Sequence, residues 1–201
     1  MVARVLPNDV GCFGMTYVRL TEIVLSIPFL SITCTDCDFR GSSFATTGLF
    51  RWSHKGQTFD FERRLGLCLD CNKIVATEDF PDAETMERAR SIRTTYTGQP
   101  LLRLLEPDYA KYLASQVGFE LLEEVLALDR QPVCLECGKS AVRSIDRPEG
   151  VSSEVPVSLN LGHPWCAGSL QVQSSGGLRM SVRAKTYVYN IHGQLISSYD
   201  E

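Results

Sequence analysis

The alternation of apolar and polar residues predicts β-strands over the first third of the chain. The apolar stretch 18–33 is expected to form a strand that leads into a pair of cysteines. Residues 44–52 and 57–69 are expected to form two more strands around a turn at Lys55-Gly56. A further strand over 73–77 completes the predicted β-rich segment.

The middle of the chain has a helical pattern instead. Acidic residues after Pro81 suit the positive end of a helix dipole and predict a helix over 82–95. The sequence Gly98-Gln99-Pro100 ends that pattern. A second helix is expected over 108–128, with Gly118 inside it. Its apolar face, at steps of three and four, consists of Tyr109, Leu113, Val117, Leu121, Val125 and Leu128.

The last third returns to strand patterning. Strands are expected over residues 155–161, 170–173, 178–189 and 194–199. The turns between the last three are expected at Gly176-Gly177 and His192-Gly193. Together these elements predict an α+β fold.

Composition narrows the class of protein without identifying its activity. The 201 residues are 44% hydrophobic and 22% charged, which is typical of a globular protein and excludes a collagen or a coiled coil. No apolar stretch is long enough for a membrane-spanning helix. The start of the chain lacks the pattern of a secretion signal, with Met15 as an alternative first residue, so a cytoplasmic, reducing location is expected.

The cysteines carry the strongest chemical signal. Seven of the eight, together with one histidine, form four pairs with the same i, i+3 spacing. These pairs are Cys34 with Cys37, Cys68 with Cys71, Cys134 with Cys137, and His163 with Cys166. Zinc in structural sites takes four thiolate or imidazole ligands in a tetrahedron, and each pair supplies one edge. The sequence therefore predicts two structural Zn²⁺ sites, with Cys12 left over as a bystander.

The combination of pairs into sites is open to two hypotheses. Sequential pairing, with 34/37 joining 68/71 and 134/137 joining 163/166, is favoured because it closes shorter loops. A crossed pairing would give one interleaved unit. Asn72 and Gly138 directly follow two of the pairs, and both residue types tolerate the positive φ that turns backbone N–H groups toward sulfur.

Disulfide, redox and iron–sulfur chemistry are the alternatives to zinc. Disulfides do not suit a reducing compartment. A redox Cys-x-x-Cys usually opens a helix, and no helix-forming run follows Cys37, Cys71 or Cys137.

The motifs CTDC, CLDC, CLECG and HPWCAG resemble those of the zinc-ribbon superfamily, over roughly residues 31–80 and 131–196. The resemblance implies two zinc ribbons joined by a helical segment. The implied divisions are an N-terminal extension and lead-in strand (1–30), ribbon 1 (31–80), a helical linker (81–130) and ribbon 2 with C-terminal strands (131–201). Members of this superfamily include transcription and replication factors, ribosomal proteins and protein-binding adaptors. The acidic pair of the transcript-cleavage branch is absent from the expected hairpin tip at 53–57, so that activity is not transferred.

Two stripes of basic and aromatic residues are candidates for contacting a partner. The first stripe consists of Arg51, Trp52, Lys55, Arg63 and Arg64. The second, on one face of the expected strand 178–189, consists of Arg179, Arg183, Lys185 and Tyr187. Such stripes suit single-stranded nucleic acid, or they form an ordinary solvated sheet face.

Charge and motif content favour a binding protein over an enzyme. The formal charge of −4 would become about −7 with ionised zinc sites, so nucleic-acid binding would be local and salt-sensitive. No Walker loop, dinucleotide fingerprint, HExxH or nucleophile elbow occurs. The expected function is a non-enzymatic zinc-binding adaptor or regulatory protein with a protein partner. The alternatives are a nucleic-acid-binding protein and, more weakly, a redox or metal-dependent enzyme. Nothing in the sequence determines the oligomeric state.

Overall fold

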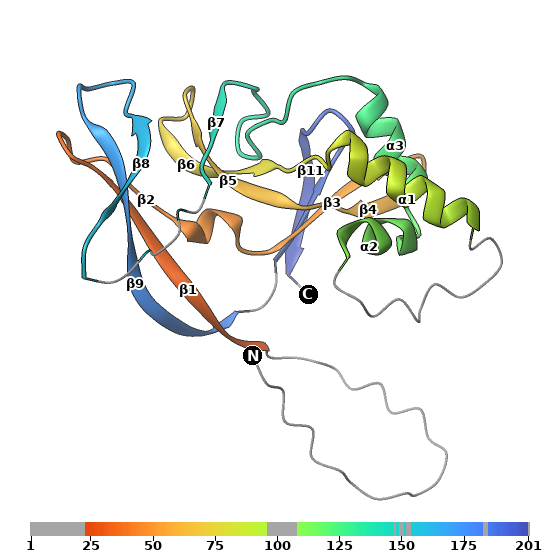
Figure 1. The fold of residues 1–201 in the computed structure, drawn as a ribbon, viewed down its shortest axis with the longest axis horizontal. Coiled ribbons are helices and arrows are strands. Elements are labelled where there is room, and N and C mark those ends of the chain that lie inside the picture. Colours follow the sequence, from red (N-terminus) through yellow and green to blue (C-terminus); the bar gives the residue numbers. More distant parts are fainter. Residues whose placement is uncertain are drawn as a thin grey trace, which may run out of the picture.

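The strands and helices form a mixed α+β fold, as expected, with α-helices between two runs of strands (Figure 1). The computed structural model describes residues 23–95, 108–146, 148, 151, 154–182 and 185–200. The strands are β1 (Ile23–Cys34), β2 (Arg40–Ser42), β3 (Leu49–His54), β4 (Gln57–Asp60), β5 (Arg63–Cys68), β6 (Lys73–Glu78), β7 (Val142–Ser144), β8 (Val157–Gly162), β9 (Ser169–Val182), β10 (Lys185–Tyr189) and β11 (Leu195–Asp200). The helices are the short 3-10 turn η1 (Ser43–Thr46), α1 (Ala83–Thr95), α2 (Tyr109–Ser115) and α3 (Phe119–Ala127).

The described strands form three sheets, with the orders β2-β1-β9-β8, β11-β10-β3-β4 and β6-β5-β7. All neighbouring strands are antiparallel except β10 and β3, which are parallel. Each sheet combines strands from the two ranges 31–80 and 131–201 that were expected to form separate ribbons. The long-range pairing is most extensive between β1 and β9, which run from Ile23 opposite Val182 to Cys34 opposite Leu170.

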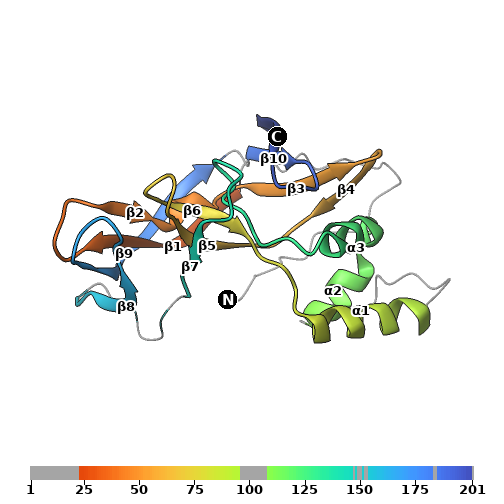
Figure 2. The ribbon, with the colours of Figure 1, turned by 90° about the horizontal axis from the view of Figure 1, so that it is seen from above.

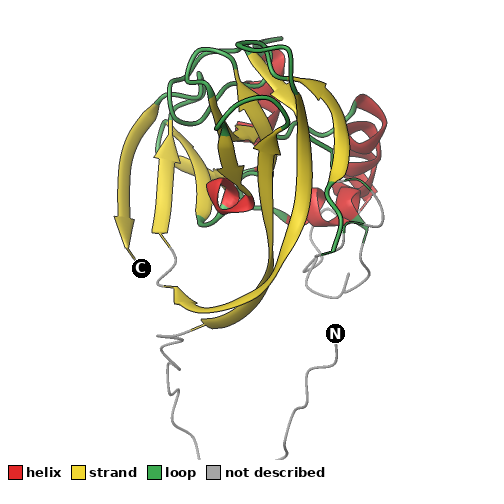
Figure 3. Ribbon diagram, turned by 90° about the vertical axis from the view of Figure 1, so that its left-hand side faces the viewer, coloured by secondary structure: helices red, strands yellow, loops and turns green. Residues whose placement is uncertain are grey.

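Two main apolar cores hold the sheets together. One lies between the β2-β1-β9-β8 and β6-β5-β7 sheets and includes Ile32, Leu67, Ile74 and Leu170. There β2 approaches so closely that a Cβ on Gly41 would lie 2.1 Å from the Ile74 side chain. The other core joins the aromatic face of the β11-β10-β3-β4 sheet to the helices, which lie at the opposite end of the molecule from β8 (Figures 1 and 2). Seen end-on, most of the helical ribbon lies to one side of the strands, and one short helix lies among them (Figure 3).

The prediction of one continuous helix over 108–128 is wrong, because the segment divides into α2 and α3. Gln116 is extended and ends α2, and Gly118 begins α3. A Cβ on Gly118 would lie 2.1 Å from the carbonyl oxygen of Thr58, so this glycine permits α3 to pack against β4. The break rotates the two halves, so that Val117, expected in the core, is 97% exposed. Among the described residues, no helix combines the length and apolar character needed to cross a bilayer.

The C-terminal strands also differ from expectation. Gly176-Gly177 does not form a turn, because β9 runs through both residues and Gly177 pairs with Pro28 of β1. The expected strand 178–189 is divided between two sheets, since its first part belongs to β9 and its last part is β10. The turns at Lys55-Gly56 and Gly193 are confirmed, with φ values of 49°, 79° and 76°.

A buried ion pair joins the second core to the segment that follows α3. Glu78, at the end of β6, is 0% exposed, and both of its oxygens accept hydrogen bonds from the Arg130 guanidinium at 2.5 and 2.6 Å. The indole N–H of Trp52 and the backbone N–H of Val133 also donate to this carboxylate, at 2.9 and 3.1 Å. Because these hydrogen bonds and the Arg130 charge compensate the carboxylate, its negative charge is tolerated in the core.

Candidate metal centres

The first centre lies where two hairpin turns meet. Cys34 ends β1 and Cys37 lies in the turn to β2, while His163 and Cys166 lie in the turn between β8 and β9. Pairing of β1 with β9 brings the two turns together, because Cys34 lies opposite Leu170. We refer to Cys34, Cys37, His163 and Cys166 as the first centre.

The donor atoms of the first centre have the spacing of a tetrahedral metal site. The Sγ atoms of Cys34 and Cys166 are 3.4 Å apart, and those of Cys37 and Cys166 are 3.6 Å apart. His163 Nδ1 lies 3.3 Å from Cys37 Sγ and 3.2 Å from Cys166 Sγ. A tetrahedron with Zn–S near 2.3 Å has edges of about 3.8 Å between sulfurs, and slightly less between sulfur and nitrogen. All four donors therefore fit around one ion.

Backbone groups and a close glycine support these ligands. The N–H of Gly168 donates to Cys166 Sγ at 3.4 Å. A Cβ on Gly168 would lie 2.5 Å from Cys34 Sγ, so a glycine is needed for the two turns to approach. A backbone hydrogen bond from Asp36 lowers the pKa of the Cys34 thiol, which favours the thiolate that a metal binds.

The second centre consists of Cys68, Cys71, Cys134 and Cys137. Cys68 ends β5 and Cys71 lies in the turn to β6, while the other two lie in the loop before β7. The two turns meet because β5 pairs with β7 and because Thr77 and Cys134 form a β-bridge. The Sγ atoms of Cys68 and Cys137 are 3.7 Å apart, and those of Cys71 and Cys134 are 3.9 Å apart. These distances again match a tetrahedral four-thiolate site.

The turns of the second centre have the expected left-handed residues. Asn72 and Gly138 have φ values of 48° and 72°, which confirms the prediction made from their positions after each pair. The N–H of Cys71 donates to Cys68 Sγ at 3.4 Å. Two ion pairs connect the turns at the surface, Lys73 with Glu136 at 3.2 Å and Lys139 with Asp70 at 3.1 Å.

Burial favours the protonated form of two thiols of the second centre, Cys71 and Cys134, until a cation is present. Burial, followed by the neighbouring thiols, raises the pKa of Cys71 to about 12. Burial also raises the pKa of Cys134. A divalent cation would stabilise the two thiolates and displace their protons. None of the seven cysteines in the described part of the chain is disulfide-bonded.

The favoured sequential pairing of the motifs is wrong. The first pair combines with the fourth and the second combines with the third, so one centre is nested within the other along the chain. The loop-closure preference was a weak criterion, because each doubling of loop length costs only about 0.6 kcal/mol. The β1–β9 and β5–β7 pairings, which sequence spacing does not reveal, decide the combination instead.

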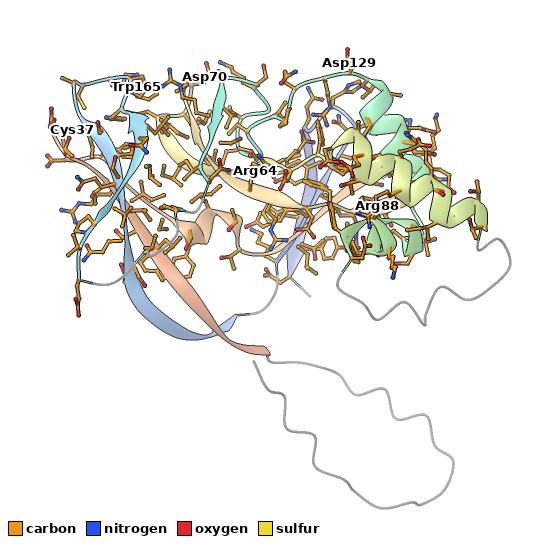
Figure 4. All side chains as sticks on the ribbon, viewed as in Figure 1. Cys37, Arg64, Asp70, Arg88, Asp129 and Trp165 are labelled. Atoms are coloured by element: carbon orange, nitrogen blue, oxygen red, sulfur yellow. The ribbon has the colours of Figure 1, made fainter. Side chains whose placement is uncertain are left out.

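The turns of both centres lie along one edge of the molecule. Trp165, in the first centre's turn, and Asp70, in the second centre's turn, both lie at the upper edge in Figure 4. The centres are joined directly, because His163 Nε2 lies 3.0 Å from Oδ1 of Asn72, the residue after Cys71. From the sequence, Asn72 stands out only as a residue that tolerates positive φ. Its contact with His163 gave no signal in the spacing.

The first basic and aromatic stripe does not form a continuous surface. Trp52 is fully buried and donates to Glu78. The cations of the first stripe have partners within the molecule: Arg51 pairs with Asp60, Arg64 with Asp79, and Lys55 with Glu124, while Arg63 donates to the carbonyl of Thr46 and lies over the Phe50 ring.

The second stripe is divided between sheets, because β9 and β10 belong to different ones. Arg183 lies outside the described residues, and Arg179 belongs to a part of β9 whose side chains are not described. Lys185 lies over the Tyr187 ring, which stacks on Phe50. The described side chains of the second stripe are therefore those of Lys185 and Tyr187 on β10.

Comparison of the chain with protein-family models, curated proteins and solved structures gave no match. The function is therefore inferred from the geometry of the molecule.

Proposed function

We propose that the protein binds two structural zinc ions and acts as a non-enzymatic adaptor for a protein partner. The observation that carries the zinc assignment is the tetrahedral spacing of four donors in each centre. Thiolate-rich sets of four suit zinc, and a complete set leaves no ligand position for a substrate, as a catalytic zinc requires. Unpaired thiols also suit the reducing cytoplasm.

Metal content is the first test of this function. Protein purified without chelator is expected to carry two zinc ions per chain by native mass spectrometry. Iron with a visible absorption band, or less than one zinc per chain, would contradict the zinc assignment. Reversible oxidation of the cysteines in the metal-loaded protein would favour the redox alternative.

An exposed edge strand supports the adaptor assignment. β11 is the edge of its sheet in the described structure, and all six of its residues are exposed. Among them, Leu195, Ile196 and Tyr199 are large apolar side chains. An edge strand can accept an extended segment of another protein through backbone hydrogen bonds.

A cavity beside β11 offers a place for a side chain of such a segment. It has a volume of about 480 Å³, and Leu195 of β11 lies in its wall. Other wall residues are Phe44, Phe50, Tyr187 and Tyr189. Pockets lined by aromatic side chains give edge-strand recognition its specificity. We therefore assign an extended, apolar segment of a partner protein to β11.

Substitution of Ile196 tests the partner surface. Ile196→Lys places a charge on the edge strand and is expected to reduce capture of a stoichiometric partner at least tenfold in a quantitative pull-down. Thr58→Lys is the matched control, because Thr58 is exposed on β4 at the opposite edge of the same sheet. Equal capture by both variants, or no stoichiometric partner with wild type, would overturn the assignment.

Nucleic-acid binding has less support, because the cations of the first stripe already have partners within the molecule. A mobility shift of single-stranded nucleic acid at low salt, weakened by Arg51→Glu, would reverse this preference.

A further inference from the structure

His163, a ligand of the first centre, contacts a side chain of the second centre's turn. The residue is 3% exposed, and its ring packs against Phe39 and Trp165 with ring centroids 4.5 and 5.4 Å away. Its Nδ1 faces the sulfurs of Cys37 and Cys166 at 3.3 and 3.2 Å. Its Nε2 lies 3.0 Å from Asn72 Oδ1.

This arrangement selects the tautomer that binds a metal. An imidazole ligand needs a lone pair on the nitrogen that faces the ion, here Nδ1, so the proton must lie on Nε2. The amide oxygen of Asn72 is a hydrogen-bond acceptor and can accept a hydrogen bond from the Nε2–H group of His163. Such a contact fixes the ring orientation and increases the basicity of the ligating nitrogen.

The position of Asn72 depends on the second centre. Asn72 directly follows Cys71, and its left-handed backbone, with φ of 48°, belongs to the turn that carries Cys68 and Cys71. That turn is closed by the Cys71 N–H to Cys68 Sγ hydrogen bond and by the ion pair of Lys73 with Glu136 across the centre. A metal bound by Cys68 and Cys71 would hold this turn in place.

We infer that Asn72 is a positioning residue that couples the two centres, so that metal at the second centre increases the metal affinity of the first. The inference rests on the proposed zinc binding. It predicts cooperative loading, in which metal at the four-thiolate centre helps to present His163 to the ion of the first centre in the correct tautomer. By thermodynamic linkage, metal at the first centre increases the affinity of the second by the same factor.

Two substitutions of Asn72 separate its hydrogen bond from its backbone role. Asn72→Gly keeps the left-handed conformation and removes the acceptor, whereas Asn72→Asp keeps both an acceptor and tolerance of positive φ. Asn72→Gly is expected to lower the zinc affinity of the first centre about 10- to 100-fold relative to wild type. Asn72→Asp is expected to keep that affinity close to the wild-type value. The measurement is competition with a zinc-binding dye, with cobalt absorption spectra used to distinguish the three-thiolate, one-imidazole centre from the four-thiolate centre.

A double-mutant cycle tests the coupling itself. Cys137→Ser removes an exposed ligand of the second centre and is expected to weaken zinc binding at the first centre by a similar factor. In the Asn72→Gly background, Cys137→Ser is expected to cause no further loss at the first centre. If the double variant instead loses zinc affinity at the first centre by the product of the two single-variant factors, the coupling is overturned.

The outcomes distinguish this inference from the proposed function. If wild type binds two zinc ions and Asn72→Gly binds both with unchanged affinity, zinc binding stands and the coupling is wrong. If wild type binds no zinc, the proposed function is wrong. As a measurement on wild type alone, nitrogen NMR of the zinc-loaded protein is expected to show a protonated, slowly exchanging Nε2 on His163. A proton on Nδ1 would also overturn the inference.

Discussion

Chelation of both zinc ions is expected to unfold the chain, and added zinc is expected to refold it. Structural zinc contributes about 10–16 kcal/mol per site, which equals or exceeds the net stability of about 5–15 kcal/mol of a typical domain. The ligands of each centre come from strands far apart in the chain, β1 with the β8–β9 turn and β5 with the loop before β7. Without metal, these distant segments would lose the ions that connect them. Far-ultraviolet circular dichroism during chelator titration measures the loss of secondary structure.

Single-ligand variants provide the control for chelation. Cys134→Ser, at a buried ligand, is expected to give a chain that is unfolded or retains one zinc. Cys12→Ser changes the one cysteine outside the four motifs and is expected to keep both ions and the wild-type unfolding midpoint. A metal-free chain with the native spectrum and an unchanged midpoint would show that the zinc is not structural.

Arg130→Ala is expected to lower the free energy of unfolding of the zinc-loaded protein by about 3–5 kcal/mol. Glu78 is fully buried, and Arg130 supplies its two shortest hydrogen bonds and its counter-charge. Removal of one partner leaves the carboxylate uncompensated in the core, which is more costly than the loss of the pair itself. Arg130 also donates to the carbonyl of Ile191 and lies over the Phe80 ring, so these contacts would be lost as well.

Arg64→Ala is the matched control for the buried pair. Arg64 pairs with Asp79, the residue after Glu78, but both side chains are partly exposed. Exposed ion pairs contribute about 0–1 kcal/mol, so this variant is expected to unfold close to the wild-type midpoint. Denaturant titration measures the free energy of unfolding of both variants and of wild type. Equal losses would show that burial of Glu78 does not distinguish the two pairs.

Local features of the chain were predicted correctly where the signal lies within a few residues. The i, i+3 spacing identified the residues that gather in the two centres, because both members of each pair belong to one turn. The Lys55-Gly56 turn and the left-handed conformations of Asn72 and Gly138 followed from residue type alone. The helix over 82–95 matches α1, whose start is stabilised by Asp82 accepting from the Thr85 N–H at 2.7 Å.

Predictions failed where a distant part of the chain decided the outcome. The helix over 108–128 is broken at Gly118 by its contact with Thr58, sixty residues earlier in the chain. The basic residues near Trp52 predict that this side chain lies at a surface, but Glu78 provides a buried partner for its indole N–H. The strand over 178–189 divides because β10 pairs with β3, whereas β9 pairs with β1.

The sequence by itself determined which side chains are able to bind metal, since ligand type and turn spacing are local properties. Only the tertiary structure decided which motifs share a centre. Strand pairing between β1 and β9, and between β5 and β7, brings together turns that are far apart in sequence. The same pairing places Asn72 of one centre against His163 of the other. These contacts depend on the packing of whole sheets, and no spacing within the chain encodes them.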